Sequence, residues 1–245
     1  MTKNRAFALV SLSCVLLVSC KSGPKTIKYS IDLSETGQQH RMELINAAER
    51  VATRRLAAIN AKGTAKAVPD GSGATLSLTV PDKKVAKSID ELLVAPFSID
   101  IRTQIKPLTD FKQNDPNDGN WKMSDITNKD FEWIQVIGDK ATGKIGVELV
   151  FTTEGRKKFE KVFTDLAATN NRLAPTTPKL APTAANPASL NIGIFVRNAL
   201  VSALTPQGTK LDSHVIITGI PKPAMAQVFA DDVNVGLHVV FTPQS

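Results

Sequence analysis

Long apolar runs, cysteine and aromatic residues are scarce in this chain of 245 residues, and each shortage excludes a class of protein. No run of about 20 apolar residues occurs, which excludes a protein with several membrane-spanning helices. Cys14 and Cys20 are the only cysteines, so we expect neither a zinc site built on cysteine nor a disulfide scaffold. Tyr29, Trp121 and Trp133 are too scattered to stack nucleic acid bases, and we do not expect nucleic acid as a partner.

The first twenty residues have the pattern of a secretory signal. Lys3 and Arg5 precede a short apolar stretch, and Leu-Val-Ser stands directly before Cys20. This stretch resembles the lipobox of bacterial lipoproteins, which implies cleavage before Cys20 and acylation of its thiol. The alternatives are an ordinary signal peptide with an incidental cysteine, or a short anchor. We expect residues 1–19 to be a lipoprotein signal peptide and residues 20–26 a lipidated tether.

The position of the charges agrees with a lipid anchor near the N-terminus. Residues 21–106 carry 14 Lys/Arg and 9 Asp/Glu, whereas residues 107–245 carry 14 of each. The basic excess therefore lies in the half nearest the lipid, and an anionic bilayer surface is its simplest partner. We expect the protein in the cell envelope, facing the periplasm. An Asp directly after the lipidated cysteine would resemble the inner-membrane retention signal of enterobacterial lipoproteins. Lys21 stands at that position here, which slightly favours the outer membrane.

The apolar periodicity of residues 27–106 predicts the order β-α-β-β-α-β of a ferredoxin-like unit. The remaining chain predicts a second set of strands and helices, with a closing helix over 224–235 and a closing strand over 237–241. Four prolines within 170–189 predict an extended, mobile loop there.

Several short motifs follow one another along the chain. They are Ile31-Asp32-Leu33, Arg54-Arg55, Phe151-Thr152-Thr153-Glu154-Gly155, Ile192 to Val196 with Val201-Ser202-Ala203, Ile217-Thr218-Gly219, Ala226 and Gly236-Leu237. Their order and spacing resemble the first periplasmic domain of SecD, the accessory subunit of the Sec translocase, over about residues 27–242. SecD has transmembrane helices after this domain and this sequence has none there, so proton-driven work by this chain alone is not expected.

The resemblance implies an α+β fold of two parts. A ferredoxin-like base would comprise residues 27–106 and 221–245, with the last strand joining the sheet that begins near Tyr29. A head of residues 107–220 would be inserted into the base. Cys20 would then hold the base against the membrane with the head outward.

Candidate site residues lie on the helix expected from 152 or 153 to about 168. Its apolar stripe is either core or, as the resemblance implies, a groove for unfolded polypeptide; its members are Phe159, Val162, Phe163 and Leu166. Its other face is basic, either solvated or a surface for an acidic partner, and consists of Arg156, Lys157, Lys158 and Lys161. We expect structural roles for the widely separated His40, His214 and His238. We expect no metal, no cofactor and no enzymatic activity.

The sequence thus predicts a lipid-anchored envelope protein that passively binds unfolded or emerging polypeptides, with a membrane and Sec translocase components as partners. The alternative is a structural or assembly lipoprotein whose head docks one folded envelope partner.

Overall fold

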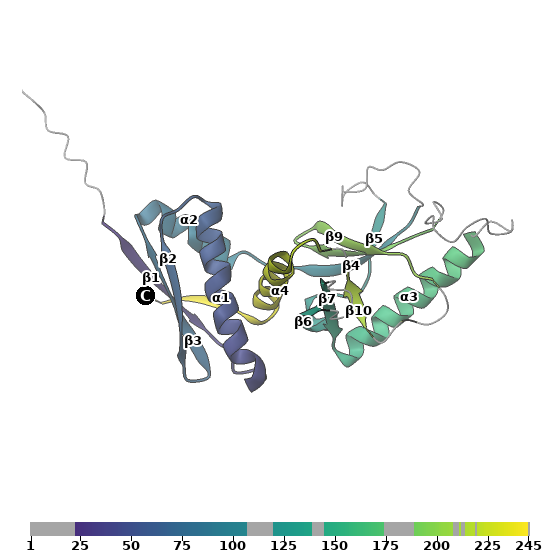
Figure 1. Ribbon diagram of the computed structural model, residues 1–245, viewed down its shortest axis with the longest axis horizontal. Coiled ribbons are helices and arrows are strands. Elements are labelled where there is room, and N and C mark those ends of the chain that lie inside the picture. The colour runs from purple at the N-terminus through teal and green to yellow at the C-terminus, as the bar shows by residue number, and fades with distance from the viewer. Residues whose placement is uncertain are drawn as a thin grey trace, which may run out of the picture.

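The protein has a mixed α+β fold, which confirms the predicted class (Figure 1). The computed structural model describes residues 23–106, 120–138, 145–173, 189–207, 211, 214–218 and 220–244. The helices are α1 (Gln38–Ala58), α2 (Lys83–Val94), α3 (Thr153–Leu173), α4 (Pro223–His238) and the short 3-10 helix η1 (Asn128–Asp130). The strands are β1 (Lys25–Ile31), β2 (Thr64–Asp70), β3 (Gly73–Val80), β4 (Ile99–Gln104), β5 (Trp121–Met123), β6 (Phe131–Gly138), β7 (Ile145–Phe151), β8 (Ile192–Val196), β9 (Ala199–Leu204), β10 (Val215–Ile217) and β11 (Phe241–Gln244).

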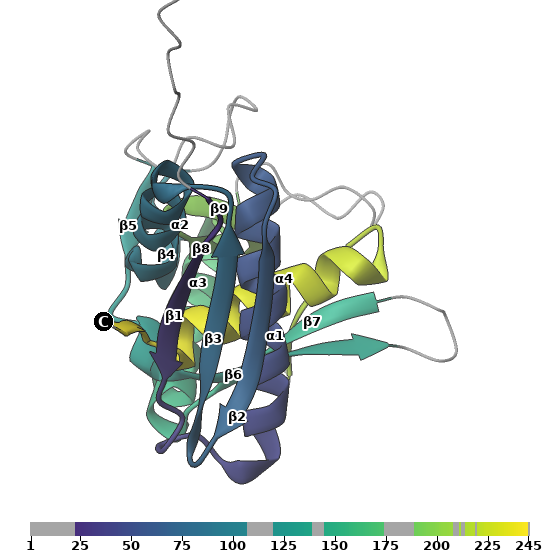
Figure 2. The ribbon, with the colours of Figure 1, turned by 90° about the vertical axis from the view of Figure 1, so that its left-hand side faces the viewer.

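The base is an antiparallel sheet in the order β11-β1-β3-β2 with α1 and α2 packed against it. Alternate residues of β1 and β3 are buried, as a sheet with one covered face requires, and Figure 2 looks onto the uncovered face. Asp82 caps α2 by accepting a hydrogen bond from the backbone N–H of Val85. Tyr29 of β1 pairs in register with Pro243 of β11. The last strand therefore joins the first sheet, as predicted.

One strand lies in a different sheet from the one expected. The segment 97–105 was predicted as the sixth element of the base, but β4 pairs with β5 and β8 instead. The open place beside β1 is taken by β11. The apolar periodicity of the sequence correctly predicts that β4 is a strand. It does not indicate which sheet contains the strand, because both faces of β4 are buried.

The head consists of β4–β10, η1 and α3. Its two sheets have the orders β10-β7-β6 and β5-β4-β8-β9, and α3 contributes to the core that they share. The elements β5 and η1 precede β6 in the chain. Helix α3 extends to Leu173, beyond its predicted end, because the buried Asn170 amide bonds both the N–H and the C=O of Leu190, at 2.7 and 2.9 Å. Of the predicted loop, residues 174–188 lie outside the described part.

Helix α4 lies between base and head and belongs to both cores (Figure 1). Ala230 and Val233 pack in the head core, whereas Val235 packs in the base core. The helix was predicted to end before Gly236 and instead continues to His238. A Cβ at Gly236 would lie 2.2 Å from the ring of Phe97, so this glycine serves close packing inside the helix and does not end it. The closing strand consequently begins at Phe241, later than predicted.

No helix in the described ranges is long and apolar enough to cross a membrane. Cys20, the predicted lipidation site, lies outside the described residues.

Candidate functional site

The apolar stripe of α3, predicted as a groove for polypeptide, is core. Phe159 is fully buried, Phe163 and Leu166 are buried, and Val162 is half-buried against the same cluster. The ring of Phe159 stacks on that of Phe151 at a centroid distance of 5.0 Å. A client chain cannot reach these side chains while the head is folded. The assignment of polypeptide binding to this stripe is therefore wrong, and the other reading, core packing, is what the structure has.

The basic face of α3 is largely paired within the protein. Arg156 contacts Glu160 at 3.0 Å and Lys161 contacts Asp165 at 2.6 Å, both one helical turn apart. Lys157 lies 3.8 Å from Glu154. Exposed pairs of this kind contribute little to stability, but they offset the positive charge of the helix surface. This face is a solvated, charge-balanced surface, which disfavours its use for an acidic partner.

Lys158 differs from its neighbours because its ammonium reaches the buried carboxylate of Asp130, at 2.8 Å. Burial alone would raise the pKa of Asp130, but hydrogen bonds from Lys158 and from the N–H of Thr127 outweigh it, and the pKa is lowered. The same contact raises the pKa of Lys158. This pair fixes the start of α3 against η1, so its role is positional.

Two of the three histidines, far apart in sequence, meet at one tryptophan. The imidazole of His40 stacks on Trp133 with a centroid distance of 4.0 Å, and that of His238 stacks on it at 5.5 Å. His238 also donates from Nε2 to the carbonyl of Glu132, at 3.0 Å. His214 lies elsewhere, on the head sheet, where its ring contacts Glu148. The predicted structural role thus describes His40 and His238, which join α1, β6 and α4.

An apolar groove that the sequence did not indicate runs between α4 and β9. It consists of two adjoining hollows of about 280 and 400 Å³ that share Val201, Met225 and Phe229. The side chains of Val201, Met225 and Val228 are 40, 52 and 37% exposed. Ile217, the last residue of β10, lines the smaller hollow. We call this feature the α4–β9 groove.

The strand that borders the groove has a free edge. In the described residues β9 pairs with β8 alone, so the backbone groups along its other edge have no strand partner. The pairing shifts between Ile194 and Phe195, which leaves Val201 as an extra residue in β9. A bulge of this kind re-aims a side chain, and Val201 is the residue of β9 that both hollows share. An unpaired edge beside exposed apolar side chains is the arrangement to which an extended chain can add as a further strand.

The other wall of the groove is held in place by buried polar contacts of α4. Asp231 is 2% exposed and receives both Nε and Nη2 of Arg50, at 2.8 and 2.7 Å, and Nη1 of Arg54, at 3.1 Å. Burial alone would raise the pKa of Asp231, but these bonds outweigh it and the pKa is lowered. One turn further along α4, the Asn234 amide bonds both the N–H and the C=O of Ile134 in β6. We call α4 with these contacts the joint.

The residues that line the groove are mainly apolar and are suited to binding. Ser202, Thr218 and Asp232 are its polar members, and no histidine or cysteine is present to activate them. The described residues contain no group of His, Cys, Asp and Glu side chains spaced to hold a metal ion. The geometry is suited to non-covalent contact with an apolar segment.

No family model matches the chain, and no curated protein matches it. Solved structures do. SecDF from Thermus thermophilus is similar over 90% of this chain, with 16% identity and a TM-score of 0.47. SecDF in a super-membrane-facing form is similar over 89%, with 13% identity and a TM-score of 0.43. A structure described as SecDF, a membrane component that enhances protein export, is similar over 89%, with 14% identity and a TM-score of 0.42.

The chain spans 30% of the length of the first two SecDF chains and 98% of the third. At these identities the likeness concerns the fold and transfers no function.

Proposed function

We propose that this protein is a lipid-anchored envelope protein, non-enzymatic, that passively binds extended segments of unfolded polypeptide as an accessory to secretion. The observation that carries the binding role is the α4–β9 groove beside the free edge of β9. The secretion-related part rests on the ordered sequence motifs that resemble SecD, and the lipid anchor rests on the lipobox-like residues before Cys20.

The groove offers two kinds of contact to an extended chain. Val201, Met225 and Val228 provide exposed apolar surface for side chains of alternate residues, which lie on one face of a strand. The edge of β9 provides backbone donors and acceptors, which bind any sequence except proline equally well. Apolar contact with backbone pairing gives affinity with little sequence preference, as a protein that receives many clients needs.

The groove is built on a rigid wall. The joint fixes α4 to two elements, to α1 through Asp231 and to β6 through Asn234. A fixed wall lowers the entropy lost when a client is bound. The binding surface is therefore preformed, and capture needs no energy source.

The test is suppression of client aggregation by the full chain, measured by light scattering of a reduced, unfolded client. Met225→Glu/Val228→Glu places two charges in the groove and should abolish the suppression. Val68→Glu/Val94→Glu is the matched control, because these valines are similarly exposed, at 50 and 48%, and lie on the base. Equal suppression by both variants would overturn the assignment of the groove.

A second measurement tests the edge of β9 separately. A peptide of alternating valine and threonine should bind the full chain, and the same peptide with alternate backbone nitrogens methylated should bind several-fold more weakly, because it cannot donate to a strand edge. Equal affinity would contradict strand addition. If pulldown from an envelope extract gives one stoichiometric folded partner and no unfolded clients, the docking alternative replaces capture.

A further inference from the structure

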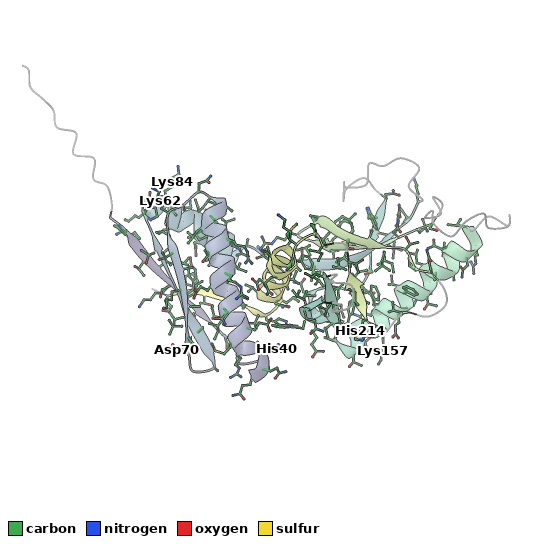
Figure 3. All side chains as sticks on the ribbon, in the orientation of Figure 1. His40, Lys62, Asp70, Lys84, Lys157 and His214 are labelled. Carbon is green, nitrogen blue, oxygen red and sulfur yellow. The ribbon has the colours of Figure 1, made fainter. Side chains whose placement is uncertain are left out.

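Four exposed lysines gather at one end of the base sheet. Lys25 begins β1, Lys62 comes just before β2, and Lys83 and Lys84 begin α2, shortly after the end of β3. Because β1 and β2 both pair antiparallel with β3, the starts of β1 and β2 meet the end of β3. Figure 3 shows Lys62 and Lys84 at this end of the base. We call it the lysine end.

The charge of the lysine end is not compensated locally. Within the described ranges, no carboxylate lies within 4.0 Å of these four ammonium groups, whereas Lys87 on the next turn of α2 contacts Glu91 at 3.8 Å. Asp82, the nearest acid in sequence, caps α2 and keeps its single negative charge, so the four lysines remain in excess. The lysine end is therefore a solvent-exposed positive patch.

The opposite end of the same sheet is acidic. Asp32 follows β1, Asp70 ends β2, and both Glu35 and Glu43 lie around the start of α1. Figure 3 shows Asp70 on the far side of the base from Lys62 and Lys84. The base thus has a positive end and a negative end along its strands, and a surface of one charge would orient it.

The covalent chain ties the positive end to the membrane. This step rests on the lipid anchor of the proposed function. Lys25 is five residues after Cys20, and five residues span at most about 18 Å. A tether this short lets these lysines approach to within the roughly 10 Å over which the surface potential of anionic headgroups acts at 0.1 M salt.

We propose that the lysine end docks on an anionic phospholipid surface and lays the long axis of the protein along the membrane. The strands of the base run across the direction from base to head (Figure 1). A bilayer against the strand ends consequently runs beside both base and head. The head then lies next to the membrane and not beyond the base, in contrast to the outward head expected from the sequence.

The experiment uses the full chain reconstituted through its own N-terminus into vesicles of phosphatidylcholine alone, or with about 30% phosphatidylglycerol. Reductive methylation with mass spectrometry reads the exposure of each lysine and keeps its charge. Anionic vesicles should slow the labelling of the lysine end several-fold. Lys157 should label equally on both vesicles, because it lies on the opposite side of the molecule from Lys62 and Lys84. About 1 M salt should remove the difference.

A charge-matched pair of variants completes the test. Lys62→Gln/Lys83→Gln/Lys84→Gln should leave Lys25 equally labelled on both vesicles, whereas Lys122→Gln/Lys129→Gln/Lys222→Gln should keep its protection. Equal labelling of the wild-type lysine end on both vesicles would overturn docking on lipid and point to an acidic protein surface. Equal protection of Lys157 would overturn the orientation. The mass of the N-terminal peptide reports acylation of Cys20 independently, so failure of the anchor is distinguished from failure of the docking.

Discussion

Trp133 shows how single residues hold base and head together. Its indole stacks with the imidazoles of both His40 from α1 and His238 from α4, while its own strand belongs to the head. Each imidazole is nearly parallel to the indole, with interplanar angles of 25 and 26°. Nothing in the sequence places these three residues together, because they come from segments about a hundred positions apart.

The position of His238 in this stack predicts that the stability of the protein depends on pH. Burial lowers the pKa of His238 from its ordinary value of 6.5, and His40 lowers it further, although the bond to the Glu132 carbonyl opposes both. The unfolded chain therefore binds more protons near pH 6, and stability rises with pH in that window. The melting temperature of the full chain should fall as the pH is lowered from about 7.5 to about 5.5.

The histidine responsible can be identified by substitution. His238→Gln should show a shallower fall than wild type over the same range, because no proton is taken up at this position on unfolding. His214→Gln, remote from Trp133, should keep the full decline. The same slope in all three proteins would show that His238 does not cause the pH dependence.

Gly155 allows α3 to pack closely against η1. A Cβ here would lie 2.0 Å from the carbonyl oxygen of Asp130, so only glycine lets α3 approach η1 this closely. Gly155→Ala should reduce the free energy of unfolding by about 1–3 kcal/mol, because backbone must move. Gly138→Ala is the control, since none of the described residues lies within 4 Å of its Cβ position. Urea unfolding of both variants measures the difference; equal stabilities would contradict the close approach.

At the scale of elements, the sequence predicts secondary structure better than it predicts placement. The alternation of β1 and β3 and the stripe of α1 led to the right elements, because each buries one face. The same reasoning found β4 and put it in the wrong sheet, since periodicity records that a face is buried and not against what. The stripe of α3 is an example of the same limit: Phe159 and Phe163 are apolar for the core, not for a client.

The groove could not have been predicted from periodicity. Its walls, α4 and β9, are separated in sequence by β10, and the exposed Val201, Met225 and Val228 become a surface only when α4 lies across the head. The motif containing Val201-Ser202-Ala203 was noticed for its resemblance, yet its physical meaning is a bulged edge strand. Sequence reasoning found the segment, and only the tertiary arrangement shows what it borders.

At the scale of the whole molecule, α4 connects the core of the base with the core of the head. Ala230 and Val233 belong to the head core and Val235 to the base core, so neither core is complete without this helix. Asp231 secures it by bonds to Arg50 and Arg54. Loss of either core should therefore expose the other, and unfolding should occur in a single transition.

Tryptophan fluorescence can follow the unfolding of each part separately. Trp121 lies in the head sheet, and it is the remaining fluorophore in Trp133→Phe, which therefore reports the head. Trp133 lies at the joint, and it is the remaining fluorophore in Trp121→Phe, which therefore reports the joint. In urea both should show the same midpoint. Asp231→Asn should lower stability by about 2 kcal/mol, because it weakens charge-assisted bonds to a buried carboxylate. It should also separate the two midpoints, since α4 is then held mainly from the head side.

Asp232→Asn is the matched control, because this neighbouring carboxylate is 44% exposed and its ion pair among the described residues is with Arg54, at 3.0 Å. It should change stability by no more than about 1 kcal/mol and leave the midpoints together. Different midpoints in the chain without the Asp231 substitution would show that base and head unfold independently. The groove wall would then move with the head alone, and the rigidity on which passive capture depends would have to come from Asn234 and its bonds to β6.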